Sequence, residues 1–273
     1  MANRSLQERV FPLRLAPELG TCVERYVHWL QHLLERLGRE ATLAVWEQVL
    51  CSPEDTLLAE ILDGDWQTDP GKPVDVAGRL DAALTTAFSR PVEGVTAKEA
   101  RALVERMPPL PQVRQRLNDL NVVQEVTTYQ SLHLLLHGLA LLIEALIDRH
   151  DKQGELIAYD TLKRWVEAGR GEEVDAEEFL KVFKTPFDPA TRHGAGLDYT
   201  LVRATADEVV LHIHDCAWAR YYQERHPRIG YLLACSMDET SYRGMNPRIR
   251  MQRTKTLMEG GGFCDFRIYA LPE

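Results

Sequence analysis

The chain has 273 residues, of which 45% are hydrophobic and 27% are charged. These globular proportions exclude a disordered or collagen-like chain. The formal net charge is −9, which argues against a nucleic-acid partner because nucleic-acid-binding proteins need a dominant basic surface. Five cysteines without a paired spacing predict a reduced, cytoplasmic protein.

We expect no membrane partner. The most apolar stretch, Leu132 to Ile147, is interrupted by His137 and Glu144, so it falls short of a membrane-spanning helix. The first twenty residues show neither an apolar core nor a small-residue cleavage site, so no secretory leader is predicted.

The first helices are predicted from apolar spacing and from capping signals. A helix from Val23 to Leu37 ends at Gly38, and a second helix runs from Thr42 to Leu50. Ser52 is the predicted N-cap of a third helix, because a proline and two acids follow it directly.

Two shorter helices follow a loop at residues 63–75. They are predicted at Val76 to Phe88 and at Thr96 to Arg106, the second opened by a Thr96/Glu99 capping box. Prolines after Met107 cannot continue that helix. A domain boundary is expected near Leu110 to Asn121, dividing the chain into a helical region at 1–120 and an α+β domain at 121–273.

Two further long helices are predicted at Val126 to His150 and at Leu156 to Ala168, and a third begins after Asp175. The segment Leu33–Arg36 (LLER) also resembles Leu146–Arg149 (LIDR). Leu43 and Trp46 match Leu156 and Tyr159 at the same offset, which indicates a faint internal repeat.

After Gly196 the apolar pattern alternates, which predicts strands. Tyr199 to Ala204 and Glu208 to His214 form a predicted hairpin, followed by a helix from Cys216 to His226. Two more strands, Arg248 to Met258 and Phe263 to Ala270, are expected to be joined by a hairpin at three glycines. The predicted fold class is therefore α+β: a helical N-terminal two thirds, then an antiparallel sheet of about four short strands with covering helices.

The segment from Cys216 to Arg267 is the richest in reactive side chains. From Ser241 onward six basic residues face three acids, a balance that suits a small anionic ligand such as a carboxylate. Arg253 is the favoured ligand-binding cation, because it alternates with two threonines in the middle of a predicted strand. The alternative is a solvated strand face.

Cys264 shares one face of the last predicted strand with Phe266 and Ile268, while Asp265 and Arg267 point the other way. Spacing alone favours a buried, inert cysteine. A nucleophilic role would need a nearby cation or base, and the sequence leaves several candidates open: Asp238, Glu239, Asp265, His212 and His214.

No metal site is expected. Cys216, Cys235 and Cys264 are far apart in sequence and lack a C-x-x-C pair. His133 and His137 are one helical turn apart and share a stripe with Glu144 and Asp148, but the polar face of an amphipathic helix is the favoured interpretation. The pair His28 and His32 is interpreted likewise.

Three runs together resemble the L-2-amino-thiazoline-4-carboxylic acid hydrolase family. They are Cys235 to Asp238 (CSMD), Arg253 to Gly260 (RTKTLMEG) and Phe263 to Arg267 (FCDFR), and Cys216 is similar to a further family position. The resemblance covers roughly Asp198 to Tyr269.

The resemblance implies hydrolysis of a small cyclic amidine-like carboxylate at a carbon–nitrogen bond, without a cofactor. On this basis Arg253 and Thr256 are expected to bind the substrate carboxylate. Asp238 or Asp265 is expected to activate water or protonate the leaving nitrogen. Cys264 is either a nucleophile or a packing residue. Cys235 is a further candidate for catalysis, and Cys216 is a candidate for substrate binding.

Two other classes of function stay open at this stage. A non-catalytic small-molecule-binding module similar to the 4-vinyl-reductase-type domains would use the same pocket without turnover. A scaffold built on the N-terminal helices is the other alternative, and a homo-oligomer is possible. The absence of a helix-turn-helix with a basic recognition helix favours the enzyme.

Overall fold

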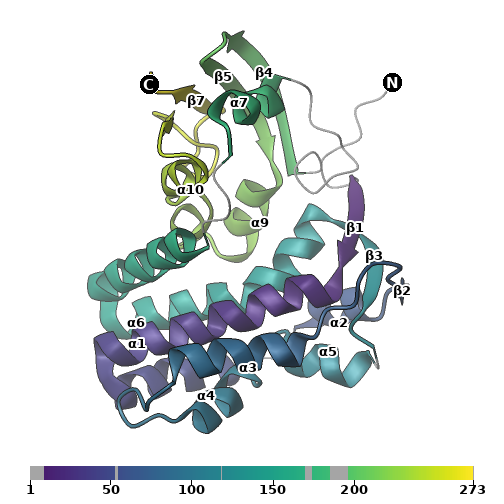
Figure 1. The fold of residues 1–273 in the computed structure, drawn as a ribbon, viewed down its shortest axis with the longest axis vertical. Coiled ribbons are helices and arrows are strands. Elements are labelled where there is room, and N and C mark those ends of the chain that lie inside the picture. Colours follow the sequence, from purple (N-terminus) through teal and green to yellow (C-terminus); the bar gives the residue numbers. More distant parts are fainter. Residues whose placement is uncertain (1–8, 53–54, 118, 170–173, 185–195, 273) are drawn as a thin grey trace. The chain divides into compact units, whose positions relative to one another are not determined.

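The computed structural model describes residues 9–52, 55–117, 119–169, 174–184 and 196–272 (Figure 1). The chain divides into two compact units. One comprises Pro12–Val126 and Gln130–Thr161, and the other comprises Leu162–Glu273 with Met1–Phe11 and Thr127–Tyr129. Helices dominate the first unit and the antiparallel sheet belongs to the second, so the fold is α+β as predicted.

Two long helices, α1 (Leu15–Leu50) and α6 (Thr128–Ala168), contribute most of the buried residues of the helical unit. Its other elements are β1 (Val10–Arg14), α2 (Thr56–Leu62), β2 (Gln67–Thr68), α3 (Val76–Ala87), α4 (Ala97–Val104), α5 (Leu110–Arg116) and β3 (Val122–Thr127). The strands form a small sheet in the order β1-β3-β2. Neither this sheet nor α5 is predicted from the sequence, because each is short and lacks a periodic apolar pattern.

The internal repeat is visible in the structure. α1 is interrupted at Gly38 (φ 78°) and α6 at Asp151 (φ 48°), and the offset between these two residues is the one that relates Leu33 to Leu146. A strand precedes each helix, β1 before α1 and β3 before α6. The repeat is therefore a strand followed by a long interrupted helix.

Residues 130–161 of α6 pack among the N-terminal helices and belong to the helical unit, while the domain division at residue 120 stays a prediction. The thiol of Cys22 in α1 lies 3.5 Å from the carbonyl oxygen of Leu135 in α6, and Trp29 and Leu139 are fully buried. This burial accounts for the apolar composition of α6. By length and composition α6 also qualifies as a candidate membrane span, but 72% of the relevant window is buried inside the protein, which is typical of a core helix.

The helix starts are partly as predicted. Thr96 and Glu99 form the capping box expected for α4. Ser52 is not the N-cap of the third helix; that residue is Asp55, whose side chain accepts hydrogen bonds from the backbone of Leu57 and Leu58. A carboxylate satisfies the exposed N–H groups of a first turn as well as a serine does.

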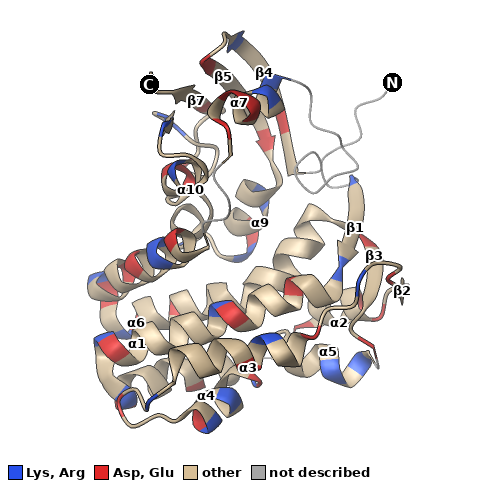
Figure 2. Cartoon of the chain, in the orientation of Figure 1, with Lys and Arg blue, Asp and Glu red and all other residues tan. Residues whose placement is uncertain are grey.

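Charged residues of both signs are interspersed along the helical unit (Figure 2). They make ion pairs between elements, such as Arg79 with Glu24 at 2.5 Å and Arg39 with Glu99 at 3.2 Å. Exposed pairs of this kind contribute little to stability individually, about 0–1 kcal/mol. The buried helix faces therefore carry most of the stability of this unit.

Gly138 marks the closest packing of α6 in the helical unit. A β-carbon there would collide with the Tyr26 hydroxyl and the Pro108 carbonyl oxygen, which are joined by a 2.6 Å hydrogen bond. We expect Gly138→Ala to lower the free energy of unfolding by about 1–3 kcal/mol, because the collision strains a packed core. Urea denaturation measures it. Gly169→Ala is the control, since its nearest contact lies at 3.4 Å, and equal effects of the two variants would contradict the packing argument.

The second unit is built on a four-stranded antiparallel sheet in the order β4-β5-β7-β6. Its elements are α7 (Ala176–Lys184), β4 (Leu197–Ala204), β5 (Glu208–Cys216), α9 (Ala217–Arg225), the π-helical turn η2 (Tyr231–Cys235), α10 (Asp238–Met245), β6 (Ile249–Gln252) and β7 (Cys264–Ala270). The hairpin between β4 and β5 and the helix after Cys216 are as predicted.

One face of this sheet carries the core. Leu211 of β5, Met251 of β6 and Ile268 of β7 pack with Phe179 and Leu180 of α7 in a single cluster. Because side chains alternate along a strand, Cys264 and Phe266 lie on the same face of β7 as Ile268, as expected from the sequence. The sheet thus presents Cys264 to the layer of covering helices.

Candidate functional site

The predicted site residues gather at one end of the four-stranded sheet. Cys216 is the last residue of β5, and Cys264 is the first of β7, which pairs antiparallel with β5 through Ile213. Arg253 follows directly after β6, whose last residue Gln252 pairs with β7. Antiparallel pairing therefore brings three chain segments that are distant in sequence to the same end of the sheet.

An ion pair occupies this end of the sheet. Nη1 of Arg253 lies 2.5 Å from Oδ2 of Asp238, in the first turn of α10, and Nη2 donates to the carbonyl oxygen of Cys235 at 2.6 Å. The side chain of Arg253 is 10% exposed and that of Asp238 is 28% exposed. The pair is thus mostly buried but open to solvent on the side of the carboxylate.

Aromatic rings hold the guanidinium in place. The central carbon of Arg253 lies 5.6 Å from the ring centre of Tyr231 and 5.5 Å from that of Phe266. Such cation–π contacts strengthen when the cation is desolvated. Tyr231 begins the π-helical turn η2, which ends at Cys235, and π-helical turns are frequent at functional sites.

Burial controls the protonation of the carboxylate. It raises the pKa of Asp238 to about 6, even though the charge of Arg253 and its hydrogen bond act in the opposite direction. This value is close to neutral pH, which suits a group that both takes up and releases a proton. Asp238 is therefore the strongest acid–base candidate of this site.

The three cysteines lie within electrostatic range of this pair and of one another. Burial raises the pKa of Cys216 to about 11 and that of Cys235 to about 12, and it also raises the pKa of Cys264. The Cys264 sulfur accepts a hydrogen bond from the backbone N–H of Leu257 at 3.1 Å. A thiol with a raised pKa is protonated at neutral pH and is a poor nucleophile.

Arg253 does not lie in mid-strand, which corrects the sequence prediction. β6 ends at Gln252, because the next backbone N–H groups, of Thr254 and Lys255, donate to Oδ1 of Asp265 at 2.9 Å rather than to a neighbouring strand. The chain therefore leaves the sheet and turns Arg253 toward Asp238. The expected tight hairpin is instead a longer connection, in which Gly260 adopts φ 83°.

Asp265 and Thr256 take part in the hydrogen bonding of this connection. Oδ2 of Asp265 accepts from the hydroxyl of Thr254 at 2.5 Å, and although burial opposes it, these hydrogen bonds lower the pKa of Asp265. The Thr256 hydroxyl donates to Glu259 at 2.9 Å and accepts from the Glu259 backbone N–H at 3.1 Å. Both side chains thus shape the segment that carries Arg253, and their predicted chemical roles stay predictions.

Asp265→Ala is expected to lower the free energy of unfolding by about 1–3 kcal/mol, because two backbone N–H groups lose their acceptor. Asp265→Asn retains an acceptor oxygen and is expected to recover most of that loss in urea denaturation. If Asp265 only stabilises the connection between β6 and β7, Asp265→Asn is expected to recover turnover as well as stability. Recovered stability without turnover would instead assign Asp265 an acid–base role.

The aromatic neighbours of the ion pair are not among the residues predicted from the sequence. Tyr231 and Phe266 flank Arg253, and Tyr242 of α10, which is partly buried, lies within electrostatic range of it; desolvation first, and then the charge of Asp238, raise the pKa of Tyr242. Tyr242 also contacts Phe179 and Phe183 of α7 edge-on. Nothing in the spacing of these residues marks them, because their contacts join segments that are separate in sequence.

The helical unit contains a second group of polar side chains, formed by Asp55, His133 and His137. The prediction that this histidine pair lies on a polar helix face is wrong, because the side chain of His133 is 1% exposed. The same prediction fails for His32, which is 3% exposed and whose Nδ1 lies 2.7 Å from the Thr161 hydroxyl. The helix faces that carry His133 on α6 and His32 on α1 are therefore buried against neighbouring elements.

Comparison with known families supports the motif analysis. A family model described as L-2-amino-thiazoline-4-carboxylic acid hydrolase matches residues 132–268, half of the chain. The matched segment contains the Asp238–Arg253 pair and all three cysteines beside it. Neither the curated proteins nor the solved structures that were compared with this chain gave a match. The chain therefore belongs to the L-2-amino-thiazoline-4-carboxylic acid hydrolase family.

Proposed function

We propose that this protein hydrolyses a small cyclic amidine that carries a carboxylate, with L-2-amino-thiazoline-4-carboxylate as the reference substrate, at the Asp238–Arg253 pair. The observation that carries this proposal is the ion pair of Asp238 with a mostly buried arginine inside the family match, where burial raises the pKa of Asp238 to about 6. A cytoplasmic location and a small anionic substrate are part of the proposal.

Arg253 supplies the recognition of the substrate carboxylate. A guanidinium has five N–H donors, and its bonds to Asp238 and to the carbonyl of Cys235 do not exhaust them. Arginine binds carboxylates through paired hydrogen bonds. The substrate carboxylate on Arg253 would therefore place the amidine ring next to Asp238.

Asp238 supplies the acid–base chemistry. The ionised carboxylate takes a proton from a water molecule, whose oxygen forms a bond to the amidine carbon. The carbon–nitrogen double bond becomes a single bond as the ring nitrogen takes up this proton from Asp238. Asp238 then transfers the remaining proton of the added hydroxyl to the same nitrogen, the carbon–nitrogen single bond breaks, the oxygen becomes a carbonyl oxygen, and the nitrogen leaves as a primary amine. One water is consumed, the ring opens, and Asp238 returns to its ionised state.

The three cysteines line the site as neutral thiols in this proposal. Cys264 is held by its hydrogen bond from Leu257, and burial raises its pKa, so a packing role is favoured over attack on the substrate. Cys264→Ser is expected to retain most of the turnover. Complete loss of turnover in a folded Cys264→Ser variant would contradict the packing role and favour Cys264 as the nucleophile.

The test is incubation of the purified full-length protein with L-2-amino-thiazoline-4-carboxylate, followed by mass spectrometry. The expected product has gained one water and carries a new primary amine. A product with a new thiol would show that the carbon–sulfur bond broke instead, and would contradict the leaving-nitrogen step.

The same experiment tests the alternative of a non-catalytic binding module. Thermal stabilisation by the compound without turnover would favour binding over hydrolysis, because a ligand that binds only the folded state raises its stability. If the compound is neither turned over nor stabilises the protein, it is excluded as the substrate.

A further inference from the structure

We propose that Asp55, His133 and His137 form a binding site for a divalent transition-metal ion, with Zn²⁺ the best fit. The candidate ligand atoms are one carboxylate oxygen and two imidazole nitrogens, all within 4.8 Å of one another. The three residues belong to the helical unit, so the proposal is independent of the hydrolysis proposed above.

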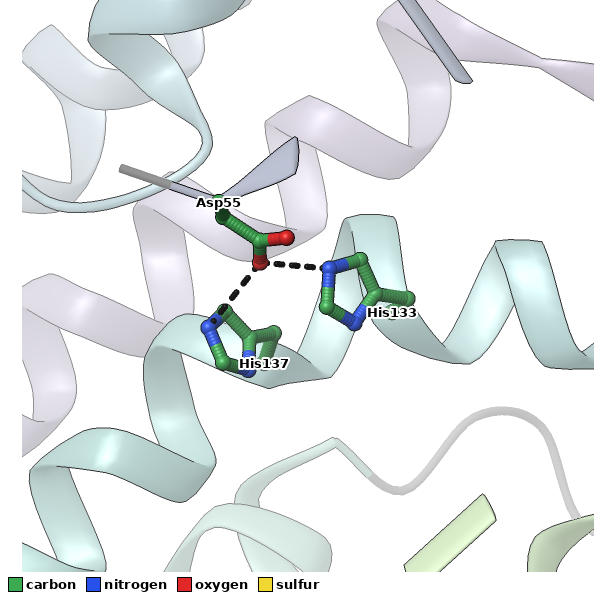
Figure 3. Close-up of side chains that lie close together, drawn as sticks. All are labelled: Asp55, His133 and His137. Carbon is green, nitrogen blue, oxygen red and sulfur yellow. Dashed lines mark ion pairs between the residues drawn. The ribbon is translucent and has the colours of Figure 1, made fainter. Parts of the chain in front are cut away.

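The two histidines present their rings to the same point. They are one turn apart on α6, and their rings stack with centres 4.6 Å apart and planes inclined by 26°. Figure 3 shows both rings directed toward the carboxylate of Asp55. Nε2 of His133 lies 2.5 Å from Oδ2 of Asp55, and Nε2 of His137 lies 3.1 Å from the same oxygen. Two histidines four residues apart on one helical face are a recurrent zinc-binding arrangement.

The backbone of α2 orients the carboxylate. Oδ1 of Asp55 accepts hydrogen bonds from the backbone N–H groups of Leu57 and Leu58, at 3.1 and 3.2 Å. The cap therefore uses one oxygen and directs the other toward the histidines. Ligating carboxylates are commonly held in this way by hydrogen bonds from outside the coordination shell.

Two of the three ligand pairs lie close to the separations that a zinc ion needs. Zinc–ligand bonds of about 2.0–2.1 Å in a tetrahedral site place ligand atoms about 3.3 Å apart. His137 and Asp55 are already near that separation, and the closer pair, His133 and Asp55, needs to open by less than about 1 Å. Such a change lies within the reach of side-chain rotation.

The three side chains of the proposed site are largely shielded from solvent. The side chains of His133, Asp55 and His137 are 1%, 14% and 19% exposed. A divalent cation would be coordinated by the two imidazole nitrogens and the carboxylate oxygen, and this donor set is that of many zinc sites.

A cavity in the same unit borders Asp55. It has a volume of about 260 Å³, and its lining includes Asp55, Gln112 and Arg116. The fourth position of a tetrahedral ion can therefore be supplied by a water molecule that enters through this cavity.

Equilibrium dialysis of the metal-stripped full-length protein against Zn²⁺, with elemental analysis, tests the site. The wild type is expected to bind about one zinc ion per chain and to gain thermal stability, because the ion binds only the folded state. Mg²⁺ is expected to give neither effect, because imidazole ligands suit it poorly.

Two variants localise the binding. Asp55→Asn keeps the cap of α2, since asparagine caps as well as aspartate, and His137→Gln changes the more exposed histidine. Each is expected to weaken zinc binding at least ~100-fold, beyond the ~10–100-fold typical of outer-shell changes. His28→Gln on α1 is the control and is expected to bind zinc as the wild type does.

Three results would overturn the proposal. They are a wild-type stoichiometry well below one, equal responses to Zn²⁺ and Mg²⁺, or undiminished zinc binding in both variants, which would place the ion elsewhere, for example at the cysteines. Asp238→Asn is expected to leave zinc binding unchanged, so a failure here is distinguishable from a failure of the proposed hydrolysis.

Discussion

Asp238→Asn is expected to lower kcat for L-2-amino-thiazoline-4-carboxylate at least ~100-fold, because asparagine can neither accept nor return the proton. The substitution keeps the shape of the side chain and its place in the first turn of α10. The Michaelis constant is expected to change little, since Arg253 remains to bind the substrate carboxylate. Steady-state kinetics by mass spectrometry measures both constants.

Glu239→Gln is the matched control for this variant. Glu239 follows Asp238 on α10 but its side chain is exposed, so wild-type turnover is expected. An Asp238→Asn protein that retains half of the wild-type kcat would remove Asp238 from the mechanism. Equal losses in both variants would indicate a general effect of charge on α10.

Arg253→Ala is expected to raise the Michaelis constant at least ~10-fold, with a smaller effect on kcat, because the charged contact to the substrate carboxylate is worth about 1.5–3 kcal/mol. The variant also leaves Asp238 without its buried partner. Removing one member of such a pair is expected to lower the free energy of unfolding by about 2–4 kcal/mol. Kinetics and urea denaturation measure the two effects separately.

Arg267→Ala is the control for Arg253→Ala. Arg267 is also an arginine paired with an acid, Glu208, but its side chain is 48% exposed. A surface pair contributes about 0–1 kcal/mol, so little change is expected in stability or kinetics. Unchanged kinetics in Arg253→Ala would refute its role in binding the substrate.

Local signals in the sequence predicted several elements correctly. Thr96 and Glu99 form their capping box, Gly38 interrupts α1, and the β4–β5 hairpin turns at residues 205–207. Each of these features depends on a few neighbouring residues, whose backbone preferences hold whatever surrounds them. The fold class followed from the change of apolar period after Gly196.

The candidate site was predictable only in part. The motif runs indicated Asp238, Arg253 and the cysteines, but not that Arg253 leaves the sheet to pair with Asp238. That turn depends on Asp265, which binds the backbone of Thr254 and Lys255 from another strand. Contacts between distant segments leave no periodic signal in the sequence.

The histidine pair on α6 shows the same limit. The spacing of His133 and His137 was visible, but the acids expected beside them were Glu144 and Asp148 on the same helix. The carboxylate comes instead from Asp55, the N-cap of α2. Helical periodicity describes one helix at a time, so it cannot indicate a ligand from a second element.

The pH dependence of kcat/KM for the wild-type protein tests the central claim most directly. Because burial raises the pKa of Asp238 from 3.8 to about 6, the folded state binds the extra proton between these values. The contribution of this proton to stability is present below about pH 4 and is lost as the pH rises through about 6.

Catalysis by ionised Asp238 follows the same titration in the opposite direction. We predict that kcat/KM rises with pH, with a midpoint near 6, and reaches a plateau above it. A midpoint near 4 would indicate an ordinary exposed carboxylate, and one above 8 would indicate a thiolate, so either result would contradict the assignment of Asp238 as the acid–base group.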